Sequence, residues 1–189
     1  VTVGGTRIDG EAGIVFLGNI AYENMDSDKD MIGDINPIFR DSALLQRIHG
    51  FIPGQFVPAL SPRMFINDWA LNSEYFTEIM HLLRSTPETM KYRGMVEELV
   101  DVKAATGDTS GREKEAIFRL CTAYLKLFFP HADSHLIRTQ KFKQEFDKYC
   151  LTPAKSMQET VLKQMRFVNP GMFPDGNLGF STYTVRWDL

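Results

Sequence analysis

A continuous apolar run, Ile14 to Leu17, stands between Gly13 and Gly18 and constrains the fold more than any other feature of this 189-residue chain. Four consecutive apolar residues bounded by glycines are typical of a strand buried on both faces, as in a parallel sheet. Asn19 follows closely, so the predicted strand delivers a polar side chain at its carboxyl end. Since ligands bind at that end of open α/β sheets, we expect a ligand site around Asn19.

Helical periodicity dominates the rest of the chain. Asp41-Ser42 is a helix N-cap signal with Leu44, Leu45 and Ile48 on one face. Further on, apolar residues at three- and four-residue spacing predict five helices. These are a helix capped by Asn72 or Ser73 and carrying Phe76, Ile79, Met80 and Leu83, then helices at about 87–104, 111–129 and 134–150, and one that Thr152-Pro153 opens and Asn169 ends.

The predicted fold class is therefore α/β, mostly α. Residues 1–60 are expected to hold the remnant of a parallel sheet, preceded by a glycine-rich, hairpin-like segment at 1–13. Residues 61–168 are expected to form a helical bundle. Residues 169–189 form a tail in which Tyr183, Val185 and Trp187 alternate, which indicates a short strand.

Charge and cysteine content exclude some function classes. The net charge is −3 and the pI is near 5.8, so any nucleic-acid contact must come from a local patch. Cys121 and Cys150 each sit in an apolar helical pattern without metal-ligand spacing, which favours buried reduced thiols and a cytoplasmic location. No apolar run approaches the roughly 18–20 residues needed to cross a bilayer, so no membrane partner is expected.

One local basic patch exists. Arg138, Lys141, Lys143 and Lys148 lie close together on the helix predicted at 134–150. They are either a DNA contact or an ordinary solvated helix face. The histidine pair His131 and His135 spans the connection between two helices, which argues against a zinc site.

Three segments together resemble AAA+ ATPases. They are GIVFLGNI (13–20), FRDSALLQRIHGFIPG (39–54) and SGREKEAI (110–117). The closest resemblance is to the Lon-like BrxL family of the BREX phage-defence systems, often described as ATP-dependent Lon-type proteases. It covers about residues 14–168, and the RIHGFIPG element is its most specific part.

The resemblance implies three roles. Asn19 corresponds to the sensor-1 residue that orients the attacking water. Arg47 corresponds to the arginine finger that is presented to the ATP of a neighbouring subunit, and Arg112 corresponds to sensor 2 in the helical lid. Phosphoryl transfer needs positive charge where negative charge develops, and the planar guanidinium suits phosphate oxygens. The implied cofactors are ATP and Mg²⁺, and the implied assembly is a ring of identical subunits that acts on DNA or polypeptide.

The chain departs from that family pattern in its phosphate-binding motifs. No G-x-x-x-x-G-K-[ST] sequence occurs in the 189 residues, and no apolar strand ends in an Asp-Glu pair. Because the chain also begins with Val1 rather than Met, we expect it to be a carboxyl-terminal part of a longer protein, with these motifs upstream. On this interpretation the chain alone neither hydrolyses ATP nor cleaves peptides.

Other interpretations stay open from sequence. Asn19 also fits a strand-end turn, while Arg47 and Arg112 also fit solvated helix positions. A non-catalytic helical scaffold or DNA-binding module is the alternative function. A Lon-type peptidase would need a Ser–Lys dyad downstream of Leu189, because Lys155 and Ser156 are adjacent on a helix and cannot face each other.

Overall fold

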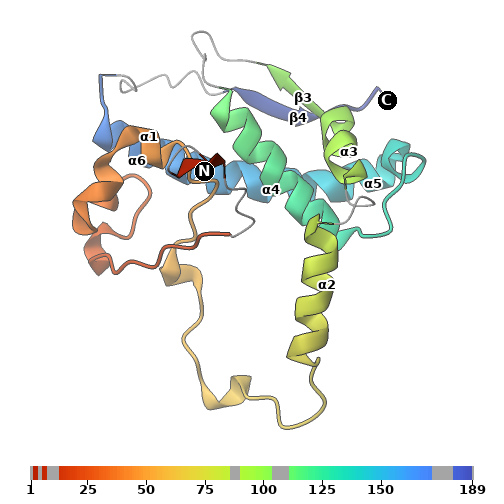
Figure 1. Ribbon diagram of the computed structural model, residues 1–189, viewed down its shortest axis with the longest axis horizontal. Coiled ribbons are helices and arrows are strands. Elements are labelled where there is room, and N and C mark those ends of the chain that lie inside the picture. Colours follow the sequence, from red (N-terminus) through yellow and green to blue (C-terminus); the bar gives the residue numbers. More distant parts are fainter. Residues whose placement is uncertain are drawn as a thin grey trace.

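The computed structural model describes residues 2–3, 6–7, 13–85, 90–103, 111–171 and 181–188. The chain is mostly helical with two small antiparallel sheets, which confirms the predicted mostly-α class (Figure 1). The helices are α1 (Ser42–Leu45), α2 (Ser73–Ser85), α3 (Lys91–Leu99), α4 (Arg112–Phe128), α5 (Gln140–Phe146) and α6 (Thr152–Val168). The strands are β1 (Thr2–Val3), β2 (Thr6–Arg7), β3 (Val100–Lys103) and β4 (Thr182–Val185). No described helix is long and apolar enough to span a bilayer.

The main core lies where α3, α4, α5 and α6 meet under the β3–β4 pair. Ile117, Cys121 and Leu125 recur at four-residue spacing on α4 and are fully buried or nearly so. Phe142 and Phe146 of α5 stack with their ring centroids 6.5 Å apart. The helix predicted at 111–129 is confirmed within one residue at each end, and the helix predicted to end at Asn169 ends at Val168.

A π-helical turn (Asp147–Leu151) joins α5 to α6 without a break. Leu151 and Thr152 both have right-handed helical dihedrals, so the helix start predicted at Thr152-Pro153 is wrong. The Thr152 N–H bonds to the carbonyl of Asp147, five residues back, and Pro153 has no N–H to place in the ladder. The helix predicted at 134–150 begins later, at Gln140, because the Thr139 side chain caps it by accepting from the Phe142 N–H at 3.3 Å.

The helix predicted at about 87–104 ends at Leu99, and the next four residues form β3. Val100 and Val102 are β-branched and pair with Val185 and Tyr183 of β4, so a long-range strand pairing overrides the helical period. The strand predicted in the tail is thereby confirmed. Trp187 lies beyond it and is 47% exposed.

The buried strand predicted at residues 14–17 is not formed. Ile14, Val15, Phe16 and Leu17 are 57–96% exposed, and no described strand pairs with them. A strand is buried on both faces only when neighbouring strands satisfy its backbone and cover its side chains. The hairpin-like segment at 1–13 does contain a strand pair, since Val3 of β1 faces Thr6 of β2.

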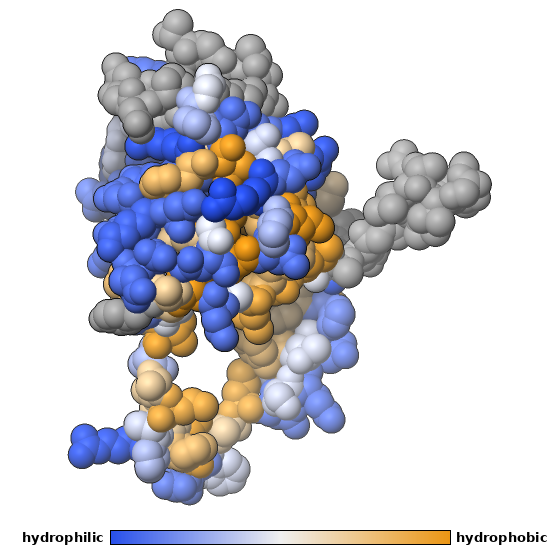
Figure 2. Space-filling view, turned by 90° about the vertical axis from the view of Figure 1, so that its left-hand side faces the viewer, coloured by the Kyte–Doolittle hydropathy of each residue, from blue (hydrophilic) through white to orange (hydrophobic). Residues whose placement is uncertain are grey.

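An extended arm, residues 56–76, projects from the body and returns through α2 (Figure 1). Apolar side chains gather on this projecting part (Figure 2). No described side chain of α2 is fully buried. On its predicted apolar face Phe76 is exposed, whereas Ile79, Met80 and Leu83 are half-buried. Exposed apolar surface of this extent is typical of an interaction site. The exposed apolar residues of the arm are Phe56, Val57, Leu60, Met64, Phe65, Ile66, Trp69, Leu71, Tyr75 and Phe76.

Candidate functional site

The segment that carries Arg47 is fixed to the helical body through α6. Ile32 and Leu45 pack against Leu162 and Met165 of α6, and all four are at most 9% exposed. Apolar burial of this kind contributes about 1.5–3 kcal/mol per large side chain. The two predicted units, 1–60 and 61–168, therefore contact each other here, although the boundaries themselves remain predictions.

A buried amide adds hydrogen bonds to this contact. Gln164 of α6 is fully buried, and its side chain donates to the carbonyls of Ser27 and Lys29 at 3.1 and 2.9 Å. It also accepts from the Met31 N–H at 2.9 Å. Beside it, Lys163 forms an ion pair with Asp28 at 2.9 Å. The loop that leads to α1 is therefore held by backbone as well as side-chain contacts.

Asn19 is exposed and lies between two points where the chain is anchored. Before it, Gly18 packs so closely on Ile35 that an added Cβ would lie 3.0 Å from Ile35 Cγ2. After it, the Ala21 N–H donates to the Asp34 carboxylate at 3.1 Å. The described contacts around Asn19 run to Ile35 and Asp34 rather than to Arg47 or Arg112, so its sensor role remains a prediction.

Arg47 follows the single turn of α1. Asp41 caps this turn, because its carboxylate accepts from the N–H groups of Ala43 and Leu44 at 2.7 and 3.0 Å. The Arg47 guanidinium folds back to donate to the Ala43 carbonyl at 2.5 Å, and its side chain is exposed. A cation at this helix end is also favoured by the helix dipole.

Two arginines of α4 contact the residues on either side of Arg47. The Arg112 guanidinium donates a hydrogen bond to the side-chain oxygen of Gln46. Arg119 lies 3.4 Å from Nε2 of His49. Because residues seven apart share one face of a helix, a single face of α4 contacts both ends of the Gln46–His49 segment.

Glu115 lies between these two arginines on α4. It accepts from Arg119 at 2.6 Å and from Arg93 of α3 at 2.9 Å. Burial opposes ionisation of Glu115, but the hydrogen bonds from Arg119 and Arg93 outweigh this effect and lower the pKa of the Glu115 carboxyl. The pKa of His49 is lowered chiefly by removal of water from the imidazole and further by the Arg119 charge. The face is thus an arginine-rich surface with one ionised carboxylate.

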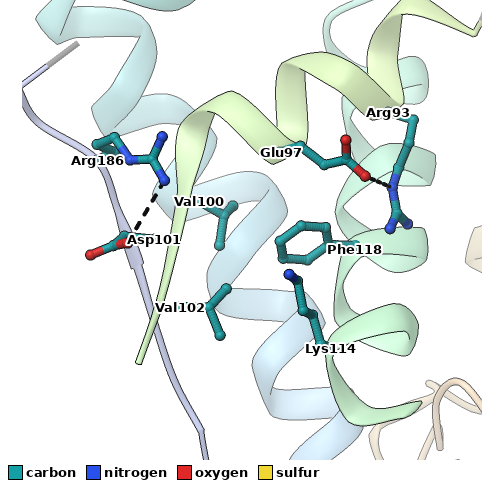
Figure 3. Close-up of a pocket in the computed structure, with 8 residues that line it drawn as sticks. All are labelled: Arg93, Glu97, Val100, Asp101, Val102, Lys114, Phe118 and Arg186. Carbon is teal, nitrogen blue, oxygen red and sulfur yellow. Dashed lines mark hydrogen bonds and ion pairs between the residues drawn. The ribbon is translucent and has the colours of Figure 1, made fainter. Parts of the chain in front are cut away.

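A hollow of about 510 Å³ opens between α3, α4 and the β3–β4 pair (Figure 3). Arg93 and Lys114 lie against the ring of Phe118 at 5.0 and 5.2 Å from its centroid. Its charges are largely paired within the hollow, as Arg93 with Glu97 illustrates (Figure 3). It therefore offers less unpaired positive charge to a phosphate than the exposed Arg47 does.

The basic cluster predicted at 138–148 is not one surface. Lys143 is fully buried and donates to the Trp187 carbonyl at 3.2 Å, and Arg138 lies 3.4 Å from Glu98. Lys141 and Lys148 remain exposed. The long Lys143 stem packs inside the core while its ammonium group reaches a backbone carbonyl, which helical spacing alone does not reveal.

The remaining sequence candidates carry no catalytic arrangement. Lys155 donates to the Tyr183 carbonyl at 3.2 Å, which holds β4 rather than activating Ser156. Across the described parts of the chain, no group of three or more His, Cys, Asp and Glu side chains could hold a metal ion.

Sequence reasoning missed Gln46, Gln164 and Arg119. Each is a polar residue in a helical pattern, where a solvated position is the ordinary expectation. The one available signal was that Arg112 and Arg119 share a helix face, since seven-residue spacing is visible in the sequence. Their partners lie 66 and 70 residues away and cannot be read from spacing.

Comparison with known proteins supplies the family. The family model described as "Lon-like protease BrxL-like, ATPase domain" matches residues 1–179. The chain is also 25% identical over 179 residues to the "Lon-like protease BrxL" of Escherichia coli O9:H4 (strain HS). That match covers 94% of this chain and 24% of the relative, so the chain spans about a quarter of the length of that protein. No solved structure matches. The chain therefore belongs to the BrxL-like family of Lon-like proteins, within its ATPase domain.

Proposed function

We propose that this chain supplies the nucleotide-sensing edge of a ring-forming ATPase, with Arg47 as the arginine finger, Arg112 as sensor 2 and Asn19 as sensor 1. The observation that carries the proposal is the contact of Arg112 with Gln46, next to Arg47 in the chain. Two of the three implied phosphate-contacting residues thus belong to one connected surface. The ATPase-domain family match supports nucleotide chemistry for this surface.

The residue types suit the reaction. Hydrolysis of ATP spreads negative charge over the oxygens of the transferred phosphoryl group, and fixed guanidinium groups stabilise that charge. Arg47 is exposed at the surface, which suits a group that acts on the nucleotide of a neighbouring subunit. Asn19 would orient water without repelling the phosphate, because its amide is neutral.

Among the described residues, no group of three or more His, Cys, Asp and Glu side chains could hold a metal ion, so these residues offer no preformed Mg²⁺ site. We therefore assign none of the described residues as a ligand of Mg²⁺. No G-x-x-x-x-G-K-[ST] sequence occurs in these 189 residues. We therefore propose that a motif elsewhere in the longer protein binds the phosphates of the nucleotide. We accordingly expect activity only from the longest natural polypeptide that carries the chain.

The arginine-finger role of Arg47 implies neighbouring subunits as partners. An arginine that completes a neighbour's site requires an oligomer, and we propose that this oligomer is a closed ring of identical subunits. We propose that this ring works in the cytoplasm in phage defence and moves DNA or polypeptide. Lys141 and Lys148 are exposed and lie seven residues apart, about two helical turns, and they are the residues of the predicted basic cluster that would reach DNA.

The experiment compares wild type with Arg47→Ala in that longest polypeptide, by ATPase rate and by gel filtration with and without nucleotide. Loss of a transition-state arginine lowers kcat by roughly 10³–10⁵-fold while leaving assembly intact. An unchanged ATPase rate in the assembled Arg47→Ala protein would contradict the finger assignment. Arg40→Ala is the matched control, since Arg40 is a nearby exposed arginine that pairs with Asp30 at 3.0 Å.

A further inference from the structure

The chain segment around Arg47 is held from two sides. From α4, Arg112 donates to Gln46, which precedes Arg47, and Arg119 approaches His49, two residues after it. Arg47 itself bonds only to its own turn among the hydrogen bonds described here, through the Ala43 carbonyl. The position of its backbone is therefore determined by its neighbours.

The other side of the segment rests on α6. Gly50 lies so close to Met157 that an added Cβ would be 2.5 Å from Met157 Cε. Tyr124 of α4 donates its hydroxyl hydrogen bond to the Met157 sulfur at 3.0 Å. Residues 46–50 thus contact α4 directly. They also contact Met157 of α6, which Tyr124 of α4 contacts as well. The segment is therefore held between α4 and α6, and Ile48 also packs against the Leu162 and Met165 cluster of α6.

We propose that Gln46 is a positioning residue, through which Arg112 of α4 sets the location of Arg47. This inference rests on the proposed function and deepens it, because it adds the regulation of the same site. In a ring, Arg112 reads the nucleotide of its own subunit while Arg47 serves the nucleotide of the next one. The Gln46 contact links the two, so the state of one site alters the finger offered to its neighbour.

The chemistry of the pair suits such a link. A guanidinium has five N–H donors in a fixed fork, so one edge can contact the Gln46 oxygen while another contacts phosphate. The Gln46 side chain is only half-buried, and water can replace the contact when it breaks. The contact is therefore exchangeable rather than a permanent part of the core.

The first test uses hydrogen exchange of the longest natural polypeptide that carries the chain. The amides of Arg47 and Ile48 bond to the Leu44 and Leu45 carbonyls at 2.9 and 3.0 Å, and report on the segment. Gln46→Met and Arg112→Met should each speed their exchange about two- to tenfold, the change expected when one hydrogen bond is lost. Gln46→Glu should restore protection, because a carboxylate accepts from Arg112 at the same place. Exchange that stays at the wild-type rate in Gln46→Met would overturn the inference.

The second test is a double-variant cycle on ATPase activity. Gln46→Met should lower kcat with KM for ATP unchanged, and Gln46→Glu should recover it. If Gln46 acts only by its contact with Arg112, the double variant has the kcat of Arg112→Met alone, whereas multiplied losses would contradict the link. Gln144→Met, on the exposed face of α5, should match wild type. Full ATPase activity in Arg47→Ala would contradict the proposed function. Full activity in Gln46→Met, together with lost activity in Arg47→Ala, would contradict only the positioning role of Gln46.

Discussion

The side-chain oxygen of Gln164 accepts a hydrogen bond from the backbone N–H of Met31 at 2.9 Å, across 133 residues of sequence. The amide nitrogen of the same side chain donates to the Ser27 and Lys29 carbonyls. One buried residue of α6 thus satisfies three backbone groups of the loop that leads to the Arg47 segment. These hydrogen bonds therefore fix the loop to α6.

We expect Gln164→Leu to destabilise the fold by about 1–3 kcal/mol, since it leaves buried backbone groups without partners. Urea unfolding followed by circular dichroism measures the change in the free energy of unfolding. The control is Gln144→Leu on α5, which is exposed and should stay within about 0.5 kcal/mol of wild type. Equal stability of the two variants would show that the loop is not anchored by this amide.

The tail strand is expected to be an integral part of the core. Tyr183 is 2% exposed and pairs with Val102 across the β3–β4 sheet. Tyr183→Ala should cost about 3–5 kcal/mol, because it removes a large buried side chain. Thr184→Ala changes the neighbouring residue on the exposed face of the same strand and should have little effect. Chemical unfolding of both variants tests this, and a small loss for Tyr183→Ala would mean that β4 is dispensable.

The imidazole of His49 should titrate below its ordinary pKa of about 6.5. Removal of water lowers this pKa most and the Arg119 charge lowers it further, whereas Glu115 raises it. NMR titration should therefore show the pKa rising in Arg119→Met and falling in Glu115→Gln. Shifts in the reverse directions would contradict the arrangement of these three residues.

The stability that His49 contributes follows from the same shift. Folding favours its neutral form, so the contribution is complete above the ordinary pKa and is lost as the pH falls toward the folded pKa. The free energy of unfolding of wild type should therefore decline more steeply than that of His49→Gln below about pH 6.5.

Both cysteines are expected to be chemically silent in the folded protein. Burial raises the pKa of Cys150 to about 12, and it also raises that of Cys121. Since the thiolate is the reactive form, iodoacetamide at pH 8 should label neither residue until the protein is unfolded. Mass spectrometry counts the labels, and rapid labelling of the native protein would show that this part of the core is open.

The helical part of the fold was largely predictable, because α4 and α6 carry long amphipathic patterns that local spacing reveals. The failures share a cause. Residues 14–17 have the composition of a buried strand, but burial depends on neighbouring strands that the described residues do not provide. Val100 to Lys103 continue a helical pattern in sequence, but pairing with β4 makes them a strand.

The candidate site was predictable in residue type but not in arrangement. Family resemblance singled out Arg47 and Arg112, and the structure links their surroundings through Gln46. Nothing in local sequence distinguishes Gln46 from any exposed glutamine, because its partner lies 66 residues away. Lys143 shows the reverse case, since a residue that reads as surface charge lies entirely inside the core.

The central claim is that Arg47 serves a nucleotide site on a neighbouring subunit while Arg112 serves the site of its own subunit. Mixing two separately impaired proteins tests it most directly: Arg47→Ala and Arg112→Ala forms of the longest natural polypeptide that carries the chain. In mixed rings, some Arg47→Ala subunits receive an Arg47 from an Arg112→Ala neighbour, so ATPase activity should rise above that of either variant. The rise should be partial, because that neighbour lacks the Arg112–Gln46 contact that positions its Arg47. Activity that does not rise in mixed rings, with subunit exchange verified, would contradict the account.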